Sequence, residues 1–201
     1  MKIIGLTGGI ASGKSTVSEH LHTAHGVPIL DADAAAYRLA EPHGPMWAAF
    51  VERYGRTRAL FPDGRLNRAA IGEIVFRDAA ERGWMDNMAH PLIRAELLKR
   101  LAGYREDGTK IVTLDVPLLY EVGWENLVDE VWVVYVDETV QLRRLMARNG
   151  LSEDLARERM GAQMPLSEKK RRADVVIDND GTVMETRAQV DRALERLLVK
   201  E

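Results

Sequence analysis

Residues 2–16 read KIIGLTGGIASGKST, and this stretch decides the fold. Its first six residues are mostly apolar, which favours a buried strand. Residues 8–16 match the pattern G-x-x-x-x-G-K-[ST], and a helical pattern follows from about residue 14 to residue 24, ending before Gly26 and Pro28. A strand, a glycine-rich turn and a helix in direct succession are the context in which this pattern binds phosphate groups.

The residue types explain how such a phosphate loop, or P-loop, works. Glycine lets the backbone turn sharply so that successive N–H groups point at phosphate oxygens, and the helix N-terminus adds partial positive charge. Lys14 can reach the β- and γ-phosphates, and the Ser15 hydroxyl can bind Mg²⁺. We therefore expect a site for a nucleoside triphosphate, with contacts from Ala11, Ser12, Gly13, Lys14, Ser15 and Thr16.

Composition narrows the class of protein. The chain has 201 residues, of which 46% are hydrophobic and 29% charged, as expected for one globular domain with insertions. No apolar run reaches the roughly 18 residues of a membrane span, and the N-terminus lacks signal-peptide features. The absence of cysteine excludes disulfides, a thiol nucleophile and a cysteine metal site. We expect a cytoplasmic protein with no membrane partner, either a monomer or a weak homo-oligomer.

The formal net charge of −3 hides an uneven distribution. Residues 141–172 contain nine basic and four acidic side chains, a net charge of +5, and the rest of the chain carries −8. A nucleic-acid-binding protein is not usually acidic over most of its length, so we expect no nucleic-acid partner. The basic window is instead a candidate for binding a smaller anion.

Short apolar runs alternate with helical patterns, which predicts an α/β fold with a parallel sheet. We expect the three-layer P-loop NTPase fold, with a core made of residues 1–33, 105–139 and 173–201. A helical insertion should occupy residues from about 34 to 104, and a helical lid residues from about 140 to 172. The last helix, from about Thr182, should bury a stripe of Val183, Val190, Leu194 and Leu197. The five expected strands are residues 2–7, 28–31, 111–115, 131–136 and 174–177.

Carboxylates follow two of these strands, at the edge where ligands bind in parallel sheets. Asp31 and Asp33 alternate, so in an extended segment both would face one site. We expect Asp33 to act as the base toward the attacking hydroxyl and Asp31 to bind the metal ion, directly or through water. The alternative is that both are turn or helix N-cap residues. Asp115 ends an apolar strand and should bind Mg²⁺, again directly or through water.

The basic window suits a lid. Arg144 and Arg148 are four residues apart, so they share one face of a predicted helix that covers residues 140–149. A second predicted helix covers residues 152–163, where Arg159 and Gln163 are also four apart. Such a lid would stabilise charge on the transferred phosphoryl group and exclude water. The alternative is a solvated pair of helices.

Further motifs occur in a fixed order along nearly the whole chain: residues 5–16, 31–33, 63–68, 90–91, 115–121, 141–148, 159–163 and 173–179. Taken together they resemble those of the dephospho-CoA kinase family. The resemblance implies transfer of the ATP γ-phosphoryl group, with Mg²⁺, to the ribose 3′-hydroxyl of dephospho-CoA. It also implies a base at Asp33, an ATP contact at Arg148, and Asn179 beside the adenine. Substrate contacts are implied at Arg68, His90, Pro91 and Asp115.

One residue departs from the family pattern: Ala11 stands where the family commonly has glycine, and alanine resists positive φ. Glu121, after the strand that ends at Asp115, is either a supporting residue of the site or solvated. His90 by itself would be a helix N-cap or a core histidine.

Two rival functions stay open from the residues. One is a P-loop kinase for another small-molecule hydroxyl or a nucleoside monophosphate, and the other is a nucleotide-switched regulatory module. No guanine-reading motif is visible, which disfavours a GTPase.

Overall fold

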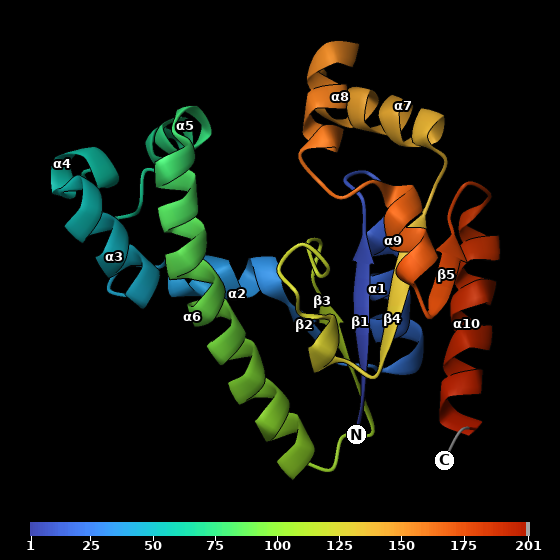
Figure 1. Ribbon diagram of the computed structural model, residues 1–201. Helices are drawn as coiled ribbons and strands as arrows, with labels where there is room; N and C mark the ends of the chain where they lie inside the picture. Colours follow the sequence, from blue (N-terminus) through green and yellow to red (C-terminus); the bar gives the residue numbers. More distant parts are fainter. Residues whose placement is uncertain (200–201) are drawn as a thin grey trace. The chain divides into compact units, whose positions relative to one another are not determined.

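The computed structural model describes residues 1–199 and divides the chain into two compact units. The first unit consists of Met1–Leu30 and the chain from Asp107 onward, and the second of Asp31–Glu106. A five-stranded parallel sheet forms the centre of the first unit (Figure 1). The expected fold class is therefore confirmed.

The sheet has the strand order β2-β3-β1-β4-β5. Each strand lies within one residue of its predicted bounds, because apolar runs covered on both faces are distinctive in sequence. Parallel pairing brings the carboxyl ends of β1 and β3 to one edge, with Leu6 opposite Asp115. The strands are β1 (Lys2–Gly8), β2 (Ile29–Asp31), β3 (Ile111–Asp115), β4 (Glu130–Tyr135) and β5 (Val175–Asp178).

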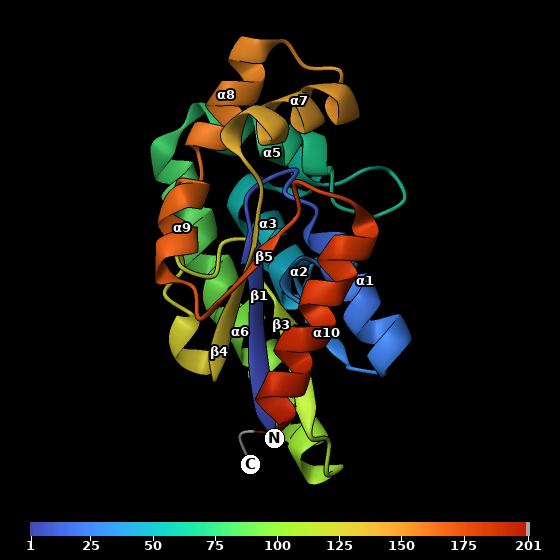
Figure 2. The same cartoon turned by 90° about the vertical axis from the view of Figure 1, so that its right-hand side faces the viewer.

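One face of the sheet is covered by α1 (Lys14–His25) and α10 (Val183–Val199), which pack against each other; in Figure 2, α10 lies in front of the strands and α1 to the right of it. Leu21 of α1 and Leu194 of α10 pack with Trp132 in one buried cluster. The last three residues of the stripe predicted for α10 are buried, but Val183 is 51% exposed. The prediction that Val183 is buried was wrong, because Val183 is the first residue of the helix and lies outside this cluster.

Four further short helices belong to the first unit. They are η1 (Glu125–Leu127), α7 (Glu138–Asn149), α8 (Glu153–Gly161) and α9 (Leu166–Arg172). Figure 1 shows α7 and α8 beyond the carboxyl edge of the sheet. The sequence indicated α7 and α8 but not α9, whose seven residues are too short for a clear periodic pattern.

The second unit contains α2 (Ala32–Leu39), α3 (Pro45–Tyr54), α4 (Arg56–Ala59), α5 (Arg68–Arg77) and α6 (Ala79–Glu106). The 28-residue α6 packs against α2, α3 and α5. Phe50, Tyr54 and Trp84 form an aromatic cluster with ring centroids 5.7–6.3 Å apart. No helix in residues 1–199 is long and apolar enough to cross a membrane.

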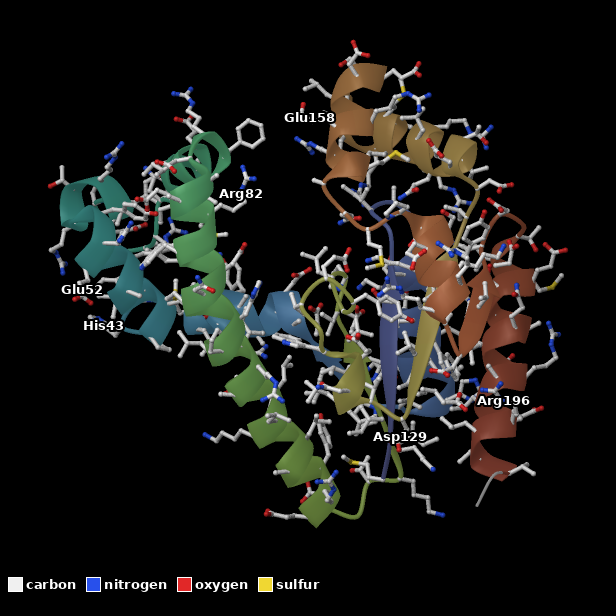
Figure 3. The ribbon with its side chains drawn as sticks, viewed as in Figure 1. His43, Glu52, Arg82, Asp129, Glu158 and Arg196 are labelled. Atoms are coloured by element: carbon white, nitrogen blue, oxygen red, sulfur yellow. The ribbon has the colours of Figure 1, made fainter. Side chains whose placement is uncertain are left out.

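Carboxylates close the amino edge of the sheet. Asp129, labelled in Figure 3, accepts a hydrogen bond from the Ile3 amide at 2.7 Å. Asp174 accepts one from the Val131 amide at the same distance. These carboxylates stabilise the fold, because they accept hydrogen bonds from backbone N–H groups at the amino edge. The side chains predicted to bind nucleotide lie at the opposite edge.

A group of three side chains joins α1 to α10. Asp191 Oδ1 lies 2.7 Å from Nε2 of His20 and 2.7 Å from Nε2 of His25. These hydrogen bonds, that of His25 first, lower the pKa of Asp191 from its ordinary value of 3.8. A carboxyl group whose pKa is lower in the folded chain stabilises the fold above its unfolded pKa, and this stability is lost as the pH falls through the lowered value.

We predict that Asp191→Asn lowers the unfolding temperature at pH 7 by about 2–4 °C, the shift that about 1 kcal/mol gives in a chain of this size. The difference between variant and wild type should narrow as the pH falls below 3.8, because the unfolded chain binds the proton there first and folded Asp191 binds it only at its lowered pKa. Thermal unfolding by circular dichroism at several pH values measures both effects. Glu195→Gln, an exposed acid on the same helix, is the control, and an Asp191→Asn difference that widens in acid would contradict the assignment.

Candidate active site

The P-loop connects β1 to α1 and leaves the start of the helix open. Gly13 is the N-cap of α1, with φ 87° and no capping side chain, and the first turn contains no acid. The loop is closed by hydrogen bonds from Ser12 N to Gly9 O and from Thr16 N to Gly13 O, both 3.0 Å. The first N–H groups of a helix have no intrahelical partner, so this end can bind an anion.

Glycine at two positions of the loop leaves room for side chains that approach its backbone. A Cβ atom on Gly13 would lie 2.1 Å from Asn179 Nδ2, and one on Gly9 would lie 2.4 Å from Gln141 Nε2. Ala11 has φ 60°, in the left-handed region. That conformation costs a non-glycine residue about 1–2 kcal/mol, so the departure from the family pattern leaves local strain in the loop.

Three side chains from distant segments hold the loop backbone. Gln141 of α7 donates to Ile10 O, and Gln163, which follows α8, accepts from Ile10 N, both at 2.8 Å. Asn179, after β5, donates to Ser12 O at 2.8 Å. The backbone N–H and C=O of Ile10 and the C=O of Ser12 are thus hydrogen-bonded to side chains from other segments. The loop therefore keeps its shape before any phosphate binds.

Lys14 and Asp115, both predicted site residues, lie in contact as an ion pair. Asp115 is 3% exposed at the end of β3, and Lys14 begins α1 beside the open amides. Ser15, the predicted Mg²⁺ ligand, is exposed in the first turn of α1. The buried Ser12 hydroxyl has no hydrogen-bond partner among residues 1–199. A lysine, open amides and an unpaired hydroxyl together suit the phosphates of a nucleotide.

The predicted lid arginines differ in their contacts. Arg144 donates to Asn179 O at 2.9 Å and so reaches the residue that holds Ser12. Arg148 is exposed, and its Nε donates to Asn149 Oδ1 at 2.9 Å. Asn179 uses its own Oδ1 to accept from Thr186 Oγ1 at 2.8 Å, so both ends of its side-chain amide are engaged. An ATP contact by Arg148 and an adenine contact by Asn179 stay predictions.

Sequence reasoning missed Lys169, which lies in α9 and is fully buried. Its Nζ atom donates to Pro117 O at 2.7 Å and pairs with Glu121 Oε1 at 2.9 Å. Glu121, left undecided by the sequence, is therefore the ion-pair partner of Lys169, and it remains an exposed residue. The available signal was the three-residue spacing of Leu166 and Lys169, which places both on one face of a helix.

Asp31 and Asp33 lie at the start of the second unit. Asp31 is the N-cap of α2, and its Oδ1 accepts from the amides of Asp33 (2.7 Å) and Ala34 (3.1 Å). Asp33 is exposed in the first turn of that helix. The expectation of an extended Asp31–Asp33 segment was wrong, because the strand ends at Asp31 and the chain turns into α2 at Ala32. The N-cap alternative is correct for Asp31.

The remaining predicted substrate residues lie on α5 and α6. The Arg68 guanidinium lies over the Tyr37 ring, 4.4 Å from its centroid, at a cavity of about 540 Å³ that Phe61 and Arg65 also line. His90 and the exposed Pro91 stand inside α6, and His90 Nε2 is 3.8 Å from the Asp86 carboxylate. His90 is thus neither a helix N-cap nor a core residue.

Comparisons with known proteins agree on one family. The dephospho-CoA kinase family model matches residues 2–185. A dephospho-CoA kinase from Symbiobacterium thermophilum is 50% identical over 193 residues, which cover 96% of this chain and 80% of that relative. The crystal structure of TT1252 from Thermus thermophilus has a TM-score of 0.80 and 35% identity, over 99% of this chain and 97% of that one.

A second solved structure, dephospho-CoA kinase from Campylobacter jejuni, has a TM-score of 0.74 and 28% identity over 98% of both chains. The family match covers most of the sequence, including the P-loop, the Lys14–Asp115 pair and the residues that hold the loop. The chain belongs to the dephospho-CoA kinase family.

Proposed function

We propose that this protein transfers the γ-phosphoryl group of ATP to the ribose 3′-hydroxyl of dephospho-CoA, giving coenzyme A and ADP, the final step of coenzyme A synthesis. The observation that carries the proposal is a pre-shaped P-loop with Lys14 at its end, in a chain of the dephospho-CoA kinase family. In the reaction a bond forms between the 3′-oxygen and the γ-phosphorus, and the bond from that phosphorus to the β,γ-bridging oxygen breaks.

The P-loop residues have distinct tasks in this reaction. The open amides and Lys14 bind the β- and γ-phosphates, for which Lys14 exchanges its Asp115 partner for phosphate oxygens. Mg²⁺, when bound, neutralises phosphate charge, and Ser15 with Asp115 and Asp31, directly or through water, would hold it. Once separated from Lys14, Asp115 offers a carboxylate to the metal ion or to the substrate.

We assign the acceptor substrate to the second unit, as a dephospho-CoA-binding insertion. Its cavity of about 540 Å³ combines the Arg65 and Arg68 guanidinium groups with the rings of Tyr37 and Phe61. Guanidinium groups bind phosphates bidentately, and aromatic rings stack on bases. Asp33 would accept or orient the proton of the 3′-hydroxyl, while His90 and Pro91 would complete the substrate contacts.

We assign residues of about 140–172 as the lid over ATP. Their helices line a cavity of about 470 Å³ together with the end of β4, and Gln141 and Gln163 belong to its wall. Arg148 would add positive charge to the transferred group when the lid closes. The monomeric or weakly oligomeric state, the cytoplasmic location and the lack of nucleic-acid and membrane partners stay predictions from the sequence.

The first prediction for this function concerns the base. Asp33→Asn should lower kcat with dephospho-CoA by about 10²- to 10⁴-fold, the usual contribution of a general base, and leave the Kd for ATP within about twofold. Coupled detection of ADP measures the rate, with Glu52→Gln, an acid on α3 labelled in Figure 3, as the matched control. Near-wild-type turnover of Asp33→Asn would remove Asp33 as the base.

An acceptor panel tests the substrate. With ATP and the wild-type enzyme, ADP release should require dephospho-CoA and should stay at background with nucleoside monophosphates or with no acceptor. Phosphorylation of a nucleoside monophosphate, with dephospho-CoA inert, would instead identify a different kinase. Slow hydrolysis that no acceptor stimulates would identify a regulatory module.

The lid assignment predicts unequal effects for two neighbouring arginines. Arg148→Ala should reduce kcat/KM for ATP by about 10²-fold, because a charge that stabilises the transition state is worth a few kcal/mol. Arg143→Ala, an exposed arginine on the same helix, should change it less than about threefold. Steady-state kinetics at saturating dephospho-CoA measures both. Equal, small effects would mean that Arg148 belongs to a solvated face of α7.

A further inference from the structure

Lys169 is a charged side chain with no exposed surface, and the mechanism above does not use it. Its ammonium group has three donors. They face Pro117 O at 2.7 Å, Glu121 Oε1 at 2.9 Å and Gly8 O at 3.4 Å. Every acceptor comes from outside α9, so this one group joins the helix to three other points of the fold.

The backbone acceptors lie at functional positions. Gly8 is the last residue of β1 and the first of the P-loop, and Pro117 stands two residues after Asp115 at the end of β3. Pro117 O also accepts from Thr7 Oγ1 at 2.9 Å. Lys169 thus contacts the end of β1, where the loop that leads to Lys14 begins, and the segment that directly follows Asp115.

Packing alone is a weak reason to bury the Lys169 ammonium group, whose partner Glu121 keeps 22% of its side chain exposed. Taking a charged lysine out of water is costly, and apolar side chains of similar volume often stabilise a fold as well or better. A leucine or methionine on α9 would fill the same space. The ammonium group supplies what an apolar residue lacks: a fixed positive charge and donors aimed at the two strand ends.

Electrostatics places Lys169 close to the phosphate site. Burial lowers the pKa of Lys169, the ion pair with Glu121 raises it, and the positive charge of Lys14 lowers it further. The two ammonium groups therefore interact, so the phosphates that Lys14 binds would attract Lys169 as well. A triphosphate also favours the protonated form of a buried lysine, because it supplies nearby negative charge.

We propose that Lys169 is a positioning residue of the ATP site: it fixes the ends of β1 and β3 against α9 and supplies a second, permanent positive charge behind the P-loop. Glu121 balances that charge when no nucleotide is bound and also accepts from Met164 N at 3.0 Å. The transfer step of this proposal rests on the proposed function, but its effect on nucleotide binding does not.

A double-mutant cycle separates charge from packing. Lys169→Met removes the ammonium group and leaves Glu121 without its cationic partner, so both the unfolding temperature and ATP affinity should fall, with at least a tenfold rise in the Kd for ATP. Adding Glu121→Gln removes the uncompensated negative charge. The double variant should regain most of the unfolding temperature and keep a Kd for ATP at least fivefold above wild type. For Glu121→Gln alone, the Kd for ATP should stay within about threefold of the wild-type value.

Two comparisons complete the experiment. The Kd for AMP should change less than twofold in the double variant, since AMP lacks the phosphates on which the charge acts. Lys170→Met, which removes an exposed lysine from the same helix, should leave the Kd for ATP within about twofold. Isothermal titration calorimetry of the full chain gives these constants without any acceptor substrate.

Several results would overturn the proposal. One is recovery of wild-type ATP affinity in the double variant along with its unfolding temperature, which would limit Lys169 to holding α9. Another is an equal loss of AMP and ATP affinity. If the double variant stays unstable, Lys169→Gln replaces it, because glutamine keeps a hydrogen-bond donor without the charge. The same comparison then decides: the change in the Kd for ATP against the change in the Kd for AMP. Failure of dephospho-CoA as acceptor would contradict the proposed function. The Kd values for ATP and AMP would still test the role of Lys169 in nucleotide binding.

Discussion

A loop that binds phosphate through its own N–H groups must be held in shape by other parts of the chain. Residues 8–13 carry almost no side chains that could do so, and Ala11 adds strain at φ 60°. Gln141, Gln163 and Asn179 bind the backbone of Ile10 and Ser12, and Lys169 contacts Gly8 O. Preorganised donors need no rearrangement when charge arrives, and that is what makes such a loop effective. The helices between residues 138 and 172 therefore form part of the phosphate site even before nucleotide binds.

The net charge of residues 141–172 has a more limited meaning than its size indicates. Arg171 and Arg172 pair with Glu168, and Arg157 pairs with Glu153, all on the helix surface. For these residues the solvated alternative is the better description. Arg144 and Lys169 point inward, to Asn179 and to the strand ends. A charge count cannot separate the two groups, because the side of the helix on which a residue lies decides its partner.

The parts of the fold that depend on local pattern could be predicted from the sequence, and the parts that depend on distant partners could not. Strands buried on both faces leave continuous apolar runs, and the P-loop is defined by consecutive residues. Asp31 was misjudged because an alternating pattern says nothing about where a strand ends, and here the Asp31 side chain itself caps the next helix. Lys169 was missed because a lysine is almost never fully buried unless it is paired, and Glu121 lies 48 residues away.

Two ion pairs meet the same edge of the sheet, and their burial suggests different roles. The Lys14 side chain is 20% exposed and its partner Asp115 lies at the end of β3, so phosphate oxygens can reach the lysine and replace the carboxylate. The Lys169 side chain is 0% exposed, and its partner cannot be exchanged without moving α9. Under the proposed function, the first pair would open when nucleotide binds, and Asp115 would then bind a metal ion or the substrate. The second pair would keep its charge in place, so the positive charge that the phosphates require would remain at this edge.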